Sequence, residues 1–325
     1  MSGLPRIGVT IVTWNSARFL PTCLDALAAQ DEPPEEVVVV DNGSTDASAE
    51  LADRHGVVTR VDRTGANLGF AAGQNRAIEQ TQTEWVLVLN PDTRLSPGFL
   101  AALGQRAGEH ARVGTLCGKL LRLGEDLEPL VPARIDSAGM EIFRSFRHLD
   151  RGSGALDTGR FETTETVFGA TGAAALYRRS MIADISLDGA FFDPDFFAYR
   201  EDADLAWRAQ ILGWDCLYVP EAVGFHLRQI VPESRSGVSA VLNRHSVKNR
   251  FLMRWKNADA ATWRHCGWRG VGRDLLVLGG CLAREWSSLP GIADALRGLP
   301  AGRRQHAWIE QHRRRPTQDV LRWFR

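Results

Sequence analysis

The first hundred residues alternate between short apolar runs and amphipathic segments, and this alternation limits the fold more than any other feature. The β-branched run over 6–14 predicts a strand, and the continuous apolar run over 37–41 predicts a strand buried on both faces. Further strands are expected over 56–62 and 85–90, with helices over 16–29, 46–55 and 73–81. Strands separated by helices in this way predict an α/β fold with an open, mostly parallel sheet and right-handed crossovers.

The rest of the chain is less regular. Strands are expected over 113–122, 133–143, 166–177, 214–219 and 222–227. One clear helix is expected over 201–213, with Gly213 ending it. From residue 234 onward the pattern is helical, with breaks expected near 267–272, at 279–280 and at Pro290.

Charge is unevenly distributed, although the formal net charge of the whole chain is zero. From Arg244 to Arg325 there are 17 Lys and Arg against 6 Asp and Glu, whereas residues 1–243 carry 22 against 33. Six of the ten tryptophans also lie in this basic segment: Trp255, Trp263, Trp268, Trp286, Trp308 and Trp323. Arginine and tryptophan on interrupted helices are typical of a surface that meets anionic lipid headgroups. The alternatives are helices packed back on the protein with solvated arginines, and nucleic-acid binding, for which no motif is present.

The cysteines and the apolar runs indicate a location. Five scattered cysteines without a C-x-x-C pair favour a reducing compartment and disfavour a disulfide framework or a zinc site. The first strand begins almost at once, which leaves no room for a signal peptide. The longest late apolar stretch, 275–283, is too short to span a bilayer. We therefore expect a cytoplasmic protein, peripheral at the inner face of the cell membrane.

Polar residues gather where the predicted parallel strands end. They are Thr13, Trp14 and Asn15, then Asp41 and Asn42, then Asn90 and Asp92. In open α/β sheets ligands bind outside this edge, so a binding site is expected there. The sequence has no G-x-G-x-x-G after the first strand and no P-loop, which argues against a nicotinamide dinucleotide and against a P-loop NTPase. Asp92, fixed at a strand end by Pro91, suits Mg²⁺ or Mn²⁺, although it could also simply turn the chain and cap the next helix.

Six segments occur in order: VTIVTWNSARFL, VVVVDNGSTDAS, ANLGFAAGQNRAI, LVLNPDTRL, GATGAAALYRRSMI and FFAYREDADLAWRAQILGW. Together they resemble the family 2 inverting glycosyltransferases of the GT-A fold, and most closely the bacterial rhamnosyltransferase branch, over about residues 5–255. The resemblance implies transfer of a sugar from a nucleotide-diphosphate donor with inversion at the anomeric carbon, usually with a divalent metal. Within this branch it favours dTDP-L-rhamnose as donor and a glycan or polyprenyl-diphosphate-linked acceptor in cell-surface polysaccharide synthesis.

The resemblance also assigns roles on the nucleotide side. The metal-binding D-x-D motif of the family appears here as Asn90-Pro91-Asp92, so only its last carboxylate is kept. Asp41 matches the carboxylate that binds the edge of the nucleotide base. Trp14 matches an aromatic residue that stacks on the base, and its neighbours Thr13 and Asn15 are expected to bind the nucleotide sugar as well. Core packing is the alternative for Trp14. Residues expected to line the nucleotide and sugar are Asn67, Gly69 and Asn75.

On the acceptor side the resemblance assigns Asp202 as the base that deprotonates the acceptor hydroxyl. It implies that Glu201 orients the acceptor or the loop; the alternative is that both residues only cap the helix. His226 is expected to bind the metal or the diphosphate, and otherwise to be a core histidine. Arg228 and Arg235 are candidates for contacts with diphosphate oxygens, or are solvated charges.

These expectations divide the chain into a GT-A catalytic domain over 1–243 and a basic, tryptophan-rich helical extension over 244–325. Within the first, residues 1–118 form the nucleotide-sugar half and 119–243 the acceptor half. Two rival functions remain: transfer from another donor, such as UDP-galactofuranose or a UDP-hexose, and a non-catalytic member that binds nucleotide or glycan in an assembly complex. A nucleotidyltransferase is disfavoured, because the N-terminal stretch lacks a Gly-rich, basic loop for a triphosphate.

Overall fold

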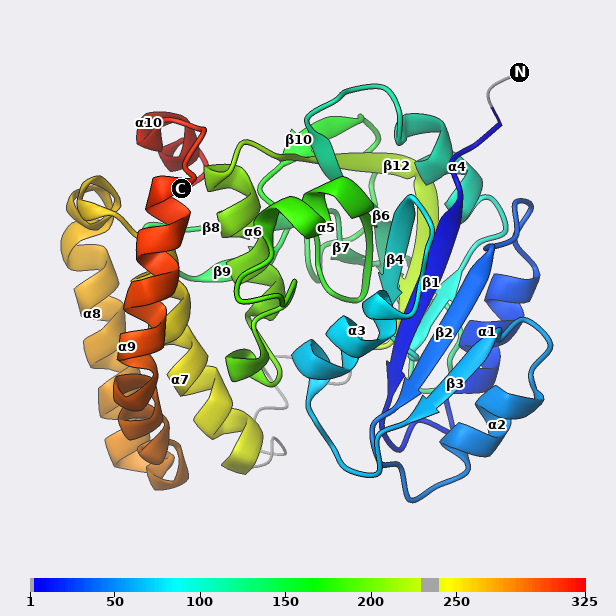
Figure 1. Cartoon of the computed structure of the whole chain (residues 1–325), viewed down its shortest axis with the longest axis horizontal. Coiled ribbons are helices and arrows are strands. Elements are labelled where there is room, and N and C mark those ends of the chain that lie inside the picture. The colour runs from blue at the N-terminus through cyan, green and yellow to red at the C-terminus, as the bar shows by residue number, and fades with distance from the viewer. Residues whose placement is uncertain (1–2, 229–239) are drawn as a thin grey trace.

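The computed structural model describes residues 3–228 and 240–325. Ten strands form one sheet: β1 (Ile7–Thr13), β2 (Glu36–Asp41), β3 (Arg60–Arg63), β4 (Trp85–Leu89), β5 (Thr93–Leu95), β6 (Val113–Arg122), β7 (Ile135–Ser137), β10 (Glu165–Val167), β11 (Ala174–Arg178) and β12 (Asp215–His226). The order across the sheet is β10-β12-β6-β11-β4-β1-β2-β3, with β5 paired to β12 and β7 to β6 (Figure 1). Two further strands, β8 (Met140–Ile142) and β9 (His148–Asp150), pair with each other.

Strand direction brings the predicted site residues to one edge of the sheet. β1 to β4 are parallel, and Thr13 lies directly opposite Asp41. β11 runs antiparallel between β4 and β6, so β6 and its parallel neighbour β12 again point the same way as β1. The carboxyl ends of β1, β2, β4 and β12 therefore share one edge. This is the edge where an open α/β sheet binds its ligands.

Helices cover both faces of the sheet. On one face lie α1 (Leu20–Ala28), α2 (Ser48–Arg54) and α4 (Phe99–Arg106), and on the other α3 (Phe70–Glu79), α5 (Arg179–Ile185) and α6 (Glu201–Ile211). Alternate residues of β4 supply the two cores, because successive side chains of a strand point to opposite faces. Leu87 and Leu89 belong to the first core, and Val86 and Val88 to the second. The short 3-10 helix η1 (Pro194–Phe196) leads into α6.

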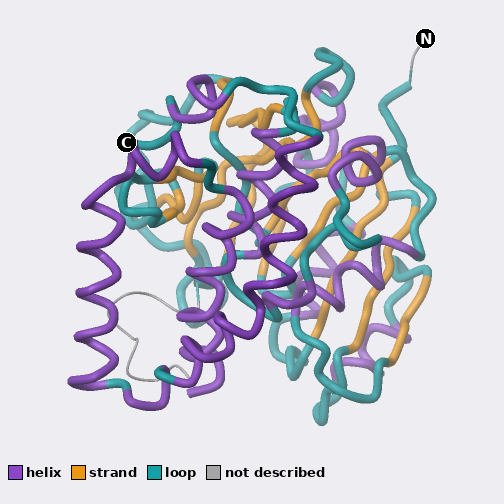
Figure 2. The backbone as a smooth tube through the Cα atoms, turned by 60° about the vertical axis from the view of Figure 1, so that its left-hand side comes forward, coloured by secondary structure: helices purple, strands orange, loops and turns teal. Residues whose placement is uncertain are grey.

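The C-terminal helices form a block beside the sheet (Figures 1 and 2). They are α7 (Ala240–Asn257), α8 (Ala260–Arg284), the 3-10 helix η3 (Trp286–Ser288), α9 (Pro290–Gln311) and α10 (Thr317–Leu321). A third core joins them to α6, since Trp207 of α6 packs in one cluster with Leu252 of α7 and Ile309 of α9. The alternative interpretation, in which these helices pack back on the rest of the chain, therefore holds for that inner side.

Several expected bounds are wrong for identifiable reasons. α1 begins at Leu20 rather than after Ser16, because Pro21 is compatible with the first helical turn but not with its interior. The segments 214–219 and 222–227 form one strand, β12, with an irregular register between Val219 and Val223. Gly139, at φ +92°, separates β7 from β8 in the segment expected as one strand over 133–143.

Other bounds differ as well. The segment 166–177 contains two strands, β10 and β11, and β3 begins four residues later than expected, at Arg60. In the C-terminal part the break near Gly267 is confirmed, because its φ of 45° kinks α8. The expected break at 279–280 is wrong, since α8 continues through both glycines. Pro290 begins α9.

Candidate active site

The end of β1 faces the end of β2 across the binding edge. The Thr13 hydroxyl and Oδ1 of Asp41 are buried, and neither has a hydrogen-bond partner in the described part of the chain. The other Asp41 oxygen accepts a hydrogen bond from the Ser44 backbone N–H at 3.2 Å. Trp14 is 55% exposed, so the core-packing alternative for this residue is wrong. A buried carboxylate oxygen beside an exposed indole suits a planar ligand that carries an N–H.

The asparagines of this edge shape its loops. Asn15, at φ 51°, accepts hydrogen bonds through Oδ1 from the backbone N–H of Thr45 at 2.8 Å and from its hydroxyl at 3.2 Å. Asn42 donates to the Gly69 carbonyl at 3.0 Å and to Oδ1 of Asn67 at 3.2 Å. The sequence placed Asn42 among the polar residues at the strand ends, but no role was assigned to it there. Asn15, Asn42 and Asn67 thus connect the loops after β1, β2 and β3.

Two residues of the segment 67–75 have contacts other than those expected. An added Cβ at Gly69 would lie 2.5 Å from the Phe197 ring, so the room at this glycine, at φ +83°, is taken by Phe197 rather than by a ligand. Asn75 donates to the Phe192 carbonyl at 2.7 Å and accepts from the Phe192 N–H at 2.9 Å. Both polar groups of Asn75 are used, so this residue fixes the loop ahead of η1.

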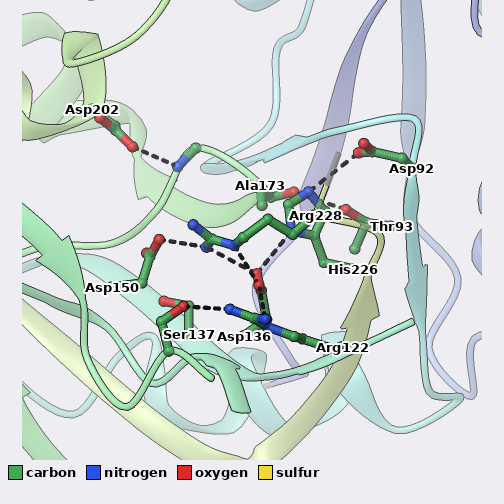
Figure 3. A network of polar contacts seen from close by, with 12 residues as sticks. Asp92, Thr93, Arg122, Asp136, Ser137, Asp150, Ala173, Asp202, His226 and Arg228 are labelled. Carbon is green, nitrogen blue, oxygen red and sulfur yellow. Dashed lines mark hydrogen bonds and ion pairs between the residues drawn. The ribbon is translucent and has the colours of Figure 1, made fainter. Parts of the chain in front are cut away.

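Asp92 and His226 meet where β5 pairs with β12 (Figure 3). Asp92 Oδ1 lies 3.3 Å from Nε2 of His226, and the Asp92 carbonyl accepts from the N–H of Leu227 at 3.0 Å. The other imidazole nitrogen, Nδ1, lies 2.8 Å from Oδ2 of Asp136, whose side chain is completely buried. Burial disfavours the imidazolium, but Asp92 and Asp136 outweigh it and raise the pKa of His226 to about 10.

Asp136 is the residue that sequence reasoning missed in this cluster. Besides His226 it binds Arg228, whose Nε lies 2.6 Å from Asp136 Oδ1. Arg228 also binds Asp150 at 2.5 Å. It is therefore not a solvated charge, and its guanidinium is already paired with two carboxylates. Burial opposes ionisation of Asp136, yet His226 and Arg228 lower its pKa to about 2. Arg235 lies outside the described residues.

Asp92 and His226 could supply two ligands to a metal ion, which is fewer than a full set. Among residues 3–228 and 240–325, no group of three or more His, Cys, Asp and Glu side chains is placed to hold a metal ion. A divalent cation bound by this pair would take its other ligands from water and from ligand phosphates, which is how Mg²⁺ is usually held. An ion at Nε2 would replace the proton that the two carboxylates now stabilise. The pair fits such an ion.

The second centre is the N-terminus of α6. Asp202 Oδ1 accepts from the Ala203 N–H at 2.7 Å, and Oδ2 accepts from the Gly172 N–H at 3.2 Å. Burial and the charge of Asp150 raise the pKa of Asp202 to about 6, against the lowering effect of these backbone bonds. Burial, followed by the charge of Asp202, also raises the pKa of Glu201 well above its ordinary value. Of the two carboxyl groups, Asp202 is therefore the one that is still ionised near neutral pH and can accept a proton.

Adjacent residues ahead of β11 join the two centres. Gly172 donates to Asp202, and the carbonyl of the next residue, Ala173, accepts from the Asn90 N–H at 2.9 Å. The Thr93 hydroxyl donates to the same carbonyl at 3.3 Å. One short segment therefore contacts both the Asp202 carboxylate and the turn that carries Asp92 (Figure 3).

Side chains of helix α7 bind α6 and the segment that precedes it. The Lys256 ammonium is buried between Asp193 at 2.6 Å and Asp204 at 2.8 Å. Asn249 donates to the carbonyls of Phe196, Ala198 and Tyr199 in the segment that leads into α6. Asp204 thus makes a buried, structural ion pair with Lys256, and Trp207 is a completely buried core residue.

Comparisons with known proteins agree with this geometry. The fold is the GT-A glycosyltransferase fold, and the chain belongs to glycosyltransferase family 2: the family model described as "Glycosyl transferase family 2" matches residues 9–186. An N-acetylglucosaminyl-diphospho-decaprenol L-rhamnosyltransferase of Mycobacterium tuberculosis is 31% identical over 276 residues, which are 80% of this chain and 85% of that protein. The chain therefore resembles the rhamnosyltransferase branch.

Two solved structures share the fold at low identity. Residues 1–349 of S. aureus TarS, in complex with UDP-GlcNAc, superpose with a TM-score of 0.58 at 16% identity, covering 94% of this chain and 90% of that one. GalNAc-T7 with UDP, GalNAc and Mn²⁺ gives a TM-score of 0.59 at 16% identity; the match covers 79% of this chain and 48% of the GalNAc-T7 chain. None of the described helices is both long enough and apolar enough to cross a membrane.

Proposed function

We propose that this family 2 glycosyltransferase moves L-rhamnose from dTDP-L-rhamnose, with inversion, to an acceptor carried on polyprenyl diphosphate. The observation that supports transfer best is the attachment of the Asp92 turn and Asp202 to the adjacent residues Ala173 and Gly172. A donor whose diphosphate lies at Asp92 would then present its anomeric carbon beside the base. The name of the mycobacterial relative supports both rhamnose and the lipid-linked acceptor.

In this proposal Asp41 and Trp14 hold the base of the donor, the first through its buried Oδ1 and the second by stacking. Mg²⁺ or Mn²⁺ would be held by Asp92 and His226, and when bound it would stabilise the charge that develops on the departing nucleoside diphosphate. Asp202 removes the proton of the acceptor hydroxyl as that oxygen attacks from the opposite face of the sugar. Glu201 orients the acceptor.

Residues 1–243 would carry these steps, with nucleotide binding mainly in 1–118 and acceptor binding mainly in 119–243. An acceptor on polyprenyl diphosphate is anchored in a membrane. We therefore assign the protein to the anionic inner face of the cell membrane, where the helices of 244–325 would meet the lipid.

Calorimetric titration with dTDP, UDP and GDP, each with and without Mn²⁺, tests the donor and the metal together. We expect metal-dependent binding of dTDP in the natural protein and loss of the metal-dependent part in Asp92→Asn. Preference for UDP would contradict the rhamnose assignment and favour a donor such as UDP-galactofuranose or a UDP-hexose. Binding of none of the three would contradict transfer from a nucleotide sugar.

A further inference from the structure

An apolar stripe runs along the outer side of α8. After the kink at Gly267 it contains Trp268, Val271, Leu275, Leu276 and Leu282, and Trp286 in η3 continues it. The spacing of three, four and seven residues between 268, 271, 275 and 282 puts these side chains on one side of a helix. We call these six residues the α8 face. Trp268 is 78% exposed, Trp286 70% and Leu276 69%.

This degree of exposure needs a physical reason. Single exposed apolar side chains are normal on soluble proteins, but contiguous exposed patches mark surfaces that meet a partner or a lipid. The α8 face is not a gap in an unfinished core, because the inner side of the same helix is well packed. Before the kink, Cys266 is buried and the Phe146 ring lies 5.0 Å from the ring of Trp263. After the kink, Cys281 is buried and Asp274 binds Arg250 and Arg254 of α7.

The charges around the α8 face select the partner. Arg264 and Arg269 are exposed on the same helix, and the Arg269 guanidinium lies 5.7 Å from the Trp268 ring centre. The only acidic residue in 260–284 is Asp274, whose carboxylate is bound by Arg250 at 2.8 Å and Arg254 at 2.7 Å. Apolar side chains with arginines beside them, and with no exposed carboxylate on that helix, complement an anionic lipid surface. A second copy placed on the same face would bring like charges together.

We infer that the α8 face lies in the headgroup region of an anionic membrane. Its contact with the lipid would determine the orientation of the active site relative to the membrane surface. This inference deepens the proposed function and rests on it for the reason why a membrane lies near. The described contacts connect the α8 face to the active site. Asp274 ties α8 to α7, and Lys256 ties α7 to Asp204, two residues after Asp202.

Co-sedimentation with phosphatidylglycerol vesicles, compared with phosphatidylcholine vesicles, tests the inference. The variant Trp268→Gln/Leu275→Gln/Trp286→Gln should lose binding to both kinds of vesicle. Arg264→Gln/Arg269→Gln should lose affinity only for phosphatidylglycerol, by about fivefold for each arginine. The matched control is Val131→Gln/Leu156→Gln, which removes exposed apolar side chains elsewhere and should bind as the natural protein does.

Unchanged binding of the α8-face variant, or absence of binding by the natural protein, would overturn the inference. So would a dimer of the natural protein that the same variant converts to a monomer, since the face would then be an interface between two copies. Transfer from dTDP-L-rhamnose to a water-soluble acceptor analogue without the polyprenyl chain is measured in parallel and should be equal in all variants. Vesicle binding without any such transfer would contradict the proposed function and leave the α8 face as inferred.

Discussion

Asp136 lies beneath His226, and its completely buried carboxylate approaches Nδ1 of that imidazole to 2.8 Å. The contact fixes which side of the ring faces Asp92, because Nδ1 is occupied and only Nε2 remains for the binding edge. Arg228 shares the same carboxylate, so one side chain sets the position of two cationic groups.

Asp136→Asn should destabilise the fold and reduce transfer. The substitution keeps the shape but removes the buried charge that His226 and Arg228 share, which leaves them only Asp92 and Asp150 as carboxylate partners. Breaking a buried pair in this way costs about 3–5 kcal/mol of unfolding free energy. Urea denaturation measures the loss, with Asp188→Asn as an exposed control. Equal midpoints for the two variants would mean that the cluster is not structurally important.

Asp202→Asn should lower the rate of transfer by about 10²–10⁴-fold, the usual contribution of a general base. Affinity for dTDP with Mn²⁺ should stay nearly unchanged, because the proposed nucleotide contacts lie at Asp41, Trp14 and Asp92. Initial rates and calorimetry on one preparation separate the two effects. Asp195→Asn, an exposed carboxylate ahead of the same helix, is the control. Normal turnover of the Asp202 variant would remove Asp202 from the mechanism.

The rate of transfer should rise with pH through about 6 and then level off, because Asp202 acts as a base only when ionised. The stability of the natural protein should change in the opposite direction. The pKa of Asp202 is higher in the folded than in the unfolded protein, so the folded protein binds a proton at Asp202 more readily. The free energy of unfolding therefore rises as the pH falls through about 6. Comparing unfolding free energies with those of Asp202→Asn over this range isolates the effect. A difference that does not vary with pH would contradict the raised pKa.

Lys256→Met should destabilise the protein by about 3–5 kcal/mol, since Asp193 and Asp204 would keep buried charges without their common partner. Lys248→Met is the matched control on the same helix, because within the described residues that ammonium hydrogen-bonds a backbone carbonyl, at Asp195, and is partly exposed. Thermal unfolding of both variants checks the prediction. A similar small loss in both would show that the ion pairs contribute little.

The parallel half of the fold was predictable because its signals are local. The apolar run over 37–41 predicts a buried strand, and the carboxylate of Asp41 marks the end of that strand where ligand binding is expected. Strand ends in a parallel sheet converge, so the meeting of Thr13 with Asp41 followed from pattern alone. Asp202 was identified through the resemblance, and its role as the base stays a prediction.

The contacts that the sequence could not reveal join distant segments. Asp136 and His226 are 90 residues apart, and nothing around Asp136 in the sequence distinguishes it from an ordinary strand residue. Gly69 was predicted to face the ligand. The space beside it is filled by the ring of Phe197, which lies more than a hundred positions later in the chain, so the sequence around Gly69 did not reveal this contact. The exposure of the α8 face depends on which side of the helix α7 and α10 cover, and this is a tertiary property.

The pairing of Lys256 with Asp193 and Asp204 has a practical consequence for anyone who trims or recombines this enzyme. A fragment ending at residue 243 would keep both carboxylates but lose the ammonium between them, together with Leu252 and Ile309 of the shared core. Such a fragment should be recovered as an insoluble product and not as a minimal catalyst. Chimeras that exchange donor specificity should therefore take α6 and the C-terminal helices from one parent. The junction between the two parent sequences should lie before β7.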